Sequence, residues 1–90
     1  MAKEGNGFEI RNCLRVLDSI RCGSKKVSHI IRDSRITSKD AYKTLEMLMG
    51  GDLIETYDAT DDNRVDVYYK LTPEGTRIKF PEQISYVLHL

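Results

Sequence analysis

Residues 24–75 constrain the fold more than any other part of this chain of 90 residues. Two short segments in its first half repeat their apolar residues at helical spacing. After two consecutive glycines the period changes from 3.6 to 2, and segments 53–58 and 64–71 predict a two-stranded hairpin around a polar turn at 59–63. A chain with this order of elements is expected to form a small, mostly helical α+β domain.

The first helix is predicted over residues 8–22. Its apolar residues recur at helical spacing and are Ile10, Cys13, Leu14, Leu17 and Ile20. Gly23 follows as a left-handed stop, and Ser24 is then the expected N-cap of a second helix. That second helix buries Val27, Ile30 and Ile31.

A third helix is predicted from Thr37 to about Met49. Residues 34–36 form the preceding turn, and Thr37-x-x-Asp40 resembles a capping box. One face of the helix carries Ala41, Leu45 and Leu48, and the opposite face carries Lys39 and Lys43, flanked by Tyr42, Glu46 and Met47. The third helix therefore has one face for the core and one for solvent or a partner.

The chain is long enough for one domain and one hydrophobic core. We expect a flexible leader at 1–7, a folded unit at 8–78 and a C-terminal apolar helix at 79–90. Within the folded unit, Thr72 is the expected N-cap before a proline at the first helical position, Pro73. No apolar run approaches the roughly 20 residues of a membrane span, and no signal peptide follows Met1. The expected location is therefore the cytoplasm, with no membrane partner.

The formal net charge is zero, but the charges are segregated along the chain. Residues 21–43 hold seven basic and two acidic side chains, whereas residues 44–66 hold one basic and seven acidic side chains. A basic helix pair can bind a polyanion although the whole chain is neutral, because the local field decides the contact. The alternative is two solvated faces of opposite sign.

These segments together resemble the winged helix-turn-helix transcription regulators of the multiple-antibiotic-resistance repressor type. The chain is also similar to small winged-helix proteins of archaea and archaeal viruses. The resemblance covers roughly residues 8–80. The motifs that carry it are Val27-x-x-Ile30-Ile31, Ile36-Thr37-Ser38-x-x-Ala41-x-x-x-Leu45-x-x-Leu48, Asp52-Leu53-Ile54-Glu55 and Tyr69-x-Leu71-Thr72-x-x-Gly75.

The resemblance implies sequence-specific binding of double-stranded DNA, with the third helix in the major groove. The residues it assigns to DNA contact are Lys25, Lys26, Thr37, Ser38, Lys39, Tyr42, Lys43 and Arg64. The chain departs from the family at the wing, where Asp58, Asp61 and Asp62 would repel phosphate. The wing is therefore either held off the DNA, with only Arg64 reaching it, or used for another contact.

No catalytic or metal-binding pattern is legible, and neither an enzymatic activity nor a cofactor is expected. Cys13 and Cys22 belong to no C-x-x-C pair, and they lie roughly 13 Å apart along one helix, too far to bridge each other. Cys13 is expected in the core. Cys22, at a helix end, is a candidate for a disulfide with its copy in a second subunit.

The last apolar segment must be buried somewhere. Packing on the chain's own core is one solution, and pairing with a second subunit is the other and the favoured one. The expected dimerisation residues are Phe80, Ile84, Val87 and Leu88. The sequence thus predicts a small homodimeric transcription regulator that reads an inverted-repeat operator; the alternative is a winged-helix protein-interaction module that docks through its acidic wing.

Overall fold

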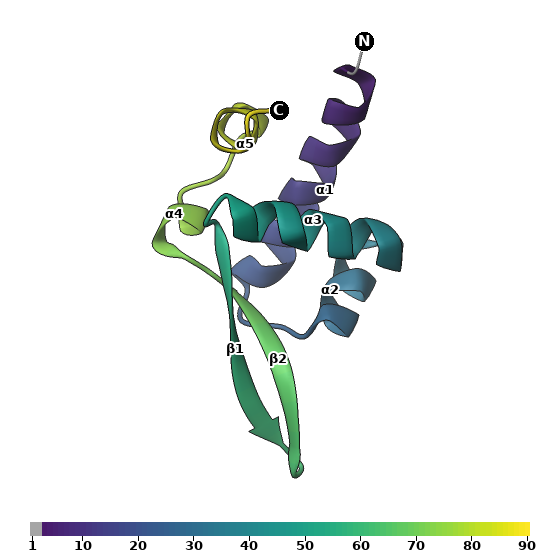
Figure 1. Cartoon of the computed structure of the whole chain (residues 1–90), viewed down its shortest axis with the longest axis vertical. Helices are drawn as coiled ribbons and strands as arrows, with labels where there is room; N and C mark the ends of the chain where they lie inside the picture. Colours follow the sequence, from purple (N-terminus) through teal and green to yellow (C-terminus); the bar gives the residue numbers. More distant parts are fainter. Residues whose placement is uncertain (1–2) are drawn as a thin grey trace.

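The computed structural model describes residues 3–90 of the chain. In chain order its elements are α1 (Lys3–Arg21), α2 (Val27–Ser34), α3 (Ser38–Gly50), β1 (Ile54–Asp61), β2 (Arg64–Leu71), α4 (Pro73–Thr76) and α5 (Pro81–Leu88). Figure 1 shows α3 crossing α1, with the β1–β2 hairpin projecting away from the helices and α5 near the opposite end. The chain is therefore α+β and mostly helical, and its hairpin follows the helices in an arrangement compatible with the winged-helix layout.

The core lies between α1, α2, α3, the start of β1 and α5. Its buried apolar side chains are Cys13, Val16, Leu17, Ile20, Ile30, Ala41, Leu45, Leu48, Leu53, Ile54, Ile78 and Ile84. The removal of this apolar surface from water is the main contribution that holds the elements together. No helix in the described range 3–90 is long and apolar enough to cross a membrane.

Both helices at the N-terminal end begin at positions that differ from the sequence-based expectation. Helix α1 begins at Lys3, so residues 3–7, expected as a flexible leader, are helical. Ser24 does not cap α2, which begins at Val27 with Lys26 as its N-cap. Lys25 instead pairs with Tyr69 of β2 through two backbone hydrogen bonds, of 3.1 and 2.8 Å. This isolated β-bridge holds the segment before α2 against β2 and replaces the local cap.

The connection between α2 and α3 is a tight turn at Arg35. This residue has left-handed backbone angles (φ 59°, ψ 42°), and its N–H donates to the Ile31 carbonyl at 3.1 Å. Thr37 is the N-cap of α3, and its Oγ1 accepts the Asp40 N–H at 3.1 Å, which is one of the two hydrogen bonds of the predicted capping box. The short connection places α3 directly across α1 and α2.

The hairpin is longer than predicted and its turn is shorter. The two strands are paired from Ile54 opposite Leu71 to Asp61 opposite Arg64. Only Asp62 and Asn63 form the turn, with φ values of 53° and 65°. Positive φ at both central residues defines the type I′ turn that matches the twist of paired strands, and Asp and Asn tolerate it. The predicted five-residue turn is therefore wrong by three residues, which extend β1.

Helix α4 is set by Thr72 and Gly75. The Thr72 hydroxyl accepts the Gly75 N–H at 3.0 Å and donates to the Asp52 carbonyl at 2.6 Å, so the predicted N-cap before Pro73 is confirmed. A Cβ at Gly75 would lie 2.0 Å from the Leu53 carbonyl oxygen. Glycine is therefore required at this position, because no side chain fits between the helix and the start of the hairpin.

Helix α5 packs on the chain's own core, although four residues of the C-terminal segment, Phe80, Ile84, Val87 and Leu88, are expected to face a second subunit. Ile84 is fully buried, and Val87 and Leu88 pack half-buried against the core. Gly51 makes room for Leu88, since a Cβ there would lie 2.4 Å from a Leu88 methyl carbon. Ile84 is thus not available to a second subunit in this conformation, whereas Phe80 remains 62% exposed.

Candidate nucleic-acid interface

Helix α3 presents two chemically different faces. The inner face consists of the buried side chains Ala41, Thr44, Leu45 and Leu48. The outer face carries the exposed residues Ser38, Lys39, Tyr42, Lys43, Glu46 and Met49. Both lysines lie in the N-terminal half of the helix, together with the half-exposed carboxylate of Asp40, and the Glu46 carboxylate lies in the C-terminal half. An anionic partner would therefore meet the N-terminal half of α3.

The N-terminal end of α3 exposes both side-chain and backbone donors. Thr37, Ser38 and Lys39 are all exposed. Within the described part of the chain, no carboxylate lies at ion-pairing distance from Lys39. The first N–H groups of a helix and its dipole favour an anion at this end. A phosphate oxygen could accept hydrogen bonds here and meet the Lys39 ammonium in the same contact.

Lys43, one turn further along α3, is already engaged within the molecule. Its Nζ lies 2.8 Å from the Glu9 carboxylate of α1, and the Lys43 side chain is 61% exposed. The hydrogen bond and the charge of Glu9 hold the pKa of Lys43 above its ordinary value. The Lys43 charge is therefore partly neutralised, and a DNA phosphate would have to compete with Glu9.

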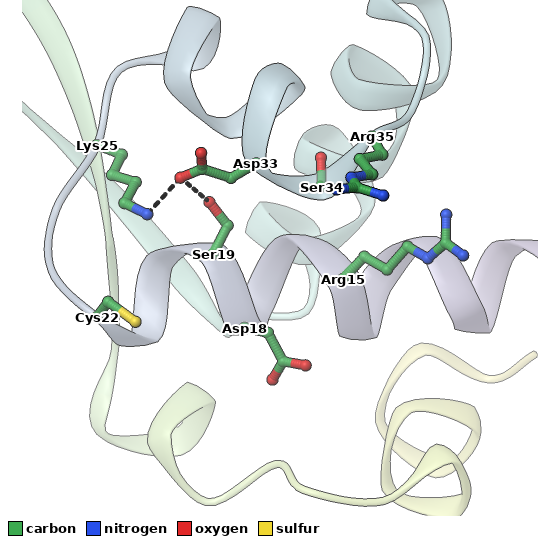
Figure 2. Close-up of a pocket in the computed structure, with 8 residues that line it drawn as sticks. All are labelled: Arg15, Asp18, Ser19, Cys22, Lys25, Asp33, Ser34 and Arg35. Atoms are coloured by element: carbon green, nitrogen blue, oxygen red, sulfur yellow. Dashed lines mark hydrogen bonds and ion pairs between the residues drawn. The ribbon is translucent and has the colours of Figure 1, made fainter.

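Lys25 and Lys26 are also paired with carboxylates, which differs from their expected role as open phosphate contacts at the start of α2. Lys25 Nζ lies 2.5 Å from the Asp33 carboxylate. The Ser19 hydroxyl donates a hydrogen bond of 3.4 Å to the same carboxylate (Figure 2). The Lys25 hydrogen bond is the main cause of the lowered pKa of Asp33. Lys26 lies 3.6 Å from Asp66 of β2. The Lys26–Asp66 pair thus joins the start of α2 to the hairpin, and the Lys25–Asp33 pair joins the segment before α2 to that helix.

Among the side chains that the structure describes at the tip of the hairpin, the carboxylates outnumber the basic groups. Asp58 and Asp62 are exposed, as is Arg64. The side chain of Asp61, which stands opposite Arg64 in the register, lies outside the described ones. Two carboxylates against one guanidinium make this tip a weak site for phosphate, in agreement with the acidity read from the sequence.

One face of the hairpin changes from half-buried to exposed along its length. Tyr69 and Leu71 at its base pack against the core, whereas Val67 and Val65 further out are 47% and 68% exposed. Burial, and to a lesser extent the nearby Tyr42 hydroxyl, raises the pKa of Tyr69. Tyr42, Tyr69 and the two valines therefore form an apolar strip that leads from α3 along the hairpin.

Within residues 3–90, the two cysteines differ in burial and take part in no candidate metal site. Among the described residues, no group of three or more His, Cys, Asp or Glu side chains could hold a metal ion. Cys13 is buried, and burial followed by the charge of Glu9 raises its pKa to about 12. Cys22 is exposed at the end of α1. The expectation that Cys13 belongs to the core is confirmed.

Comparison with known proteins adds no residue to this interface. Neither the scan against protein-family models nor the search of curated proteins finds a match to this chain. The residues that the sequence-based reasoning missed are Glu9, Asp33 and Asp66, which neutralise three of the predicted DNA-contacting lysines. No local pattern identifies Glu9 and Asp66, because each pairs with a lysine of a distant segment, and Asp33 lies eight residues after Lys25.

Proposed function

We propose that the protein binds double-stranded DNA through the N-terminal half of α3 and acts as a transcription regulator of the winged helix-turn-helix type. The observation that carries the proposal is the exposed N-terminal end of α3, with Thr37, Ser38, Lys39 and Tyr42 facing outward from a helix whose other face is buried. The tight α2–α3 turn and the following hairpin supply the rest of the layout. In such a layout the N-terminal residues of the second helix read base edges in the major groove.

The proposed contacts differ in how readily each side chain can reach a phosphate. Lys39 comes first because it needs no rearrangement, and Lys43 comes second because it must leave Glu9. Lys25 and Lys26 come last, since a phosphate would have to displace Asp33 and Asp66. Arg64 at the tip is a further candidate, opposed by the neighbouring carboxylates. DNA affinity is therefore expected to depend mainly on α3.

The test is a titration of short, random-sequence duplex DNA monitored by fluorescence anisotropy at several salt concentrations. Each phosphate contact contributes about 0.9 to the slope of log K against log salt, which is about a 3.5-fold change in affinity between 50 and 200 mM. Lys39→Ala is expected to lower that slope by about one unit. Lys79→Ala, a change at an exposed lysine between α4 and α5, is the matched control and should leave the slope unchanged. Equal slopes for the two variants would contradict the assignment of α3.

The acidic hairpin tip is proposed to limit affinity. Replacing Asp62 by Asn removes a charge that repels phosphate, so non-specific binding should become tighter. The control is Glu74→Gln in α4, another exposed carboxylate. Weaker binding of Asp62→Asn would show that this carboxylate makes a favourable contact instead.

We further propose that the regulator is a homodimer that binds an inverted repeat. Ile84 is inside the core, so the surface left for pairing on α5 consists of Phe80 and Tyr86, 62% and 83% exposed, with Val87 and Leu88 half-buried beside them. Two α3 helices one duplex turn, about 34 Å, apart would then fit the operator. Sedimentation at micromolar concentration tests this, and a non-reducing gel tests whether the exposed Cys22 links the subunits. A monomer would remove the dimer and the inverted repeat from the proposal.

A protein-interaction module is the second candidate. The outer part of the apolar strip, Val65 and Val67, lies next to exposed carboxylates. This surface favours a protein-interaction module, because it suits a basic, apolar protein partner. Failure of the full chain to bind duplex DNA at low salt would favour this function over the first.

A further inference from the structure

A cavity of about 450 Å³ lies between α1 and α2, apart from the residues proposed to contact DNA on α3. Figure 2 shows the side chains that surround it. They are Arg15, Asp18, Ser19, Cys22, Lys25, Asp33, Ser34 and Arg35. Its volume falls in the range of small-molecule sites, and its lining is rich in charged groups.

The charges around this cavity do not cancel locally. Lys25 and Asp33 neutralise each other at 2.5 Å. Asp18 lies 3.6 Å from Arg21, and Figure 2 shows its carboxylate pointing away from Asp33. Among the described residues, no carboxylate lies at ion-pairing distance from Arg15 or Arg35. Within that part of the chain, two guanidinium groups therefore line the cavity without a partner of opposite charge.

These two guanidinium groups lie at the same end of the cavity. In Figure 2, Arg15 and Arg35 are grouped beside Ser34, whereas Lys25, Asp33, Ser19 and Cys22 lie at the other end. Two like charges in one cavity repel each other. An anion between the two guanidinium groups is attracted to both, which offsets that repulsion. The guanidinium group offers a planar fork of donors that matches the oxygens of a phosphate or a carboxylate.

The backbone holds Arg35 in place for this contact. Arg35 is the C-cap of α2 in the left-handed region (φ 59°), with its N–H bonded to the Ile31 carbonyl at 3.1 Å. Glycine is the usual residue at such a helix end because a side chain there is strained. The chain instead carries a long cationic side chain whose base is fixed by the cap. Arg15 is an exposed residue of α1, and the neighbouring residue Val16 is buried in the core.

We propose that the cavity between α1 and α2 binds a small free oxyanion, a phosphate or carboxylate group, between Arg15 and Arg35. The Lys25–Asp33 pair closes the other end and contributes no net charge. The two anion-binding residues, Arg15 and Arg35, are not assigned to the duplex, whereas Lys25 at the other end of the cavity is also the last-ranked candidate for a DNA contact.

The experiment follows the arginine Nε–Hε signals of the full-length protein by NMR, in a buffer free of phosphate and carboxylate. Sodium phosphate and sodium citrate are titrated separately, with sodium chloride at matched ionic strength as the reference. Two arginine signals are expected to shift and saturate with at least one of the two oxyanions and not with chloride. Arg15→Gln should weaken that binding at least tenfold, and Arg77→Gln, at an exposed arginine after α4, should not weaken it.

A second variant separates loss of binding from loss of fold. Arg35→Gly keeps the left-handed cap with the residue that suits it best, so this variant should remain folded and should lose binding as Arg15→Gln does. Lys39→Ala should bind the oxyanion normally, which keeps this result distinct from the test of DNA binding. Shifts that do not saturate, or that survive in Arg35→Gly, would overturn the proposal. So would weaker duplex binding by Arg15→Gln without any oxyanion saturation, because the arginines would then serve the DNA backbone.

Discussion

Replacing Ile84 by Ala tests whether α5 belongs to the core of a single chain. The Ile84 side chain is fully buried on the inner face of α5, which contacts α1 and α3. Truncating a fully buried isoleucine costs about 2–5 kcal/mol, from lost transfer free energy and from the cavity left behind. For a domain of this size, 1 kcal/mol lowers Tm by about 4–8 °C, so a cost of about 3 kcal/mol corresponds to roughly 12–24 °C.

The assay is urea unfolding followed by circular dichroism at two protein concentrations tenfold apart. Glu82→Gln, at an exposed residue of the same helix, is the matched control and should change the free energy of unfolding by less than about 0.5 kcal/mol. The loss in Ile84→Ala should be the same at both concentrations, because the burial lies within one chain. A cost below about 1 kcal/mol, or a cost that appears only at the higher concentration, would refute the intramolecular burial of Ile84.

Three further outcomes are expected. A thiol reagent should label Cys22 alone in the native protein at pH 8, and both cysteines in urea. Cys13 is buried with its pKa raised to about 12, so its thiol stays protonated until the pH rises well above the pKa of an ordinary thiol. Fast labelling of Cys13 in the native protein would contradict its burial. Gly75→Ala should destabilise the fold by more than about 2 kcal/mol in thermal unfolding, because its Cβ would meet a backbone carbonyl at 2.0 Å, whereas the same change at exposed Gly50 should not. Glu9→Gln should release Lys43 and increase the salt slope of DNA binding by about one unit, and an unchanged slope would remove Lys43 from the contacts.

The features that the sequence predicted well are those decided by neighbouring residues. The caps at Thr37 and Thr72 use a hydroxyl that reaches an N–H three residues on, and both are present. The inner face of α3 follows from its 3.6-residue period, and the second strand from alternation at 64–71. The polar residues at 59–63 predict a five-residue turn, but only Asp62 and Asn63 have the positive φ of a two-residue hairpin turn, and residues 59–61 pair with β2.

What only the tertiary structure decided are the contacts between distant segments. Lys25 pairs with the Tyr69 backbone and does not begin α2. Lys43 and Glu9 form an ion pair because α1 and α3 cross. The fate of Ile84 belongs to the same group, since an apolar stripe shows that a helix face must be buried but not which surface buries it. The sequence thus determined the elements and their order through local hydrogen bonding and periodicity. Packing between elements decided which of the predicted DNA-contacting lysines remain open to a partner.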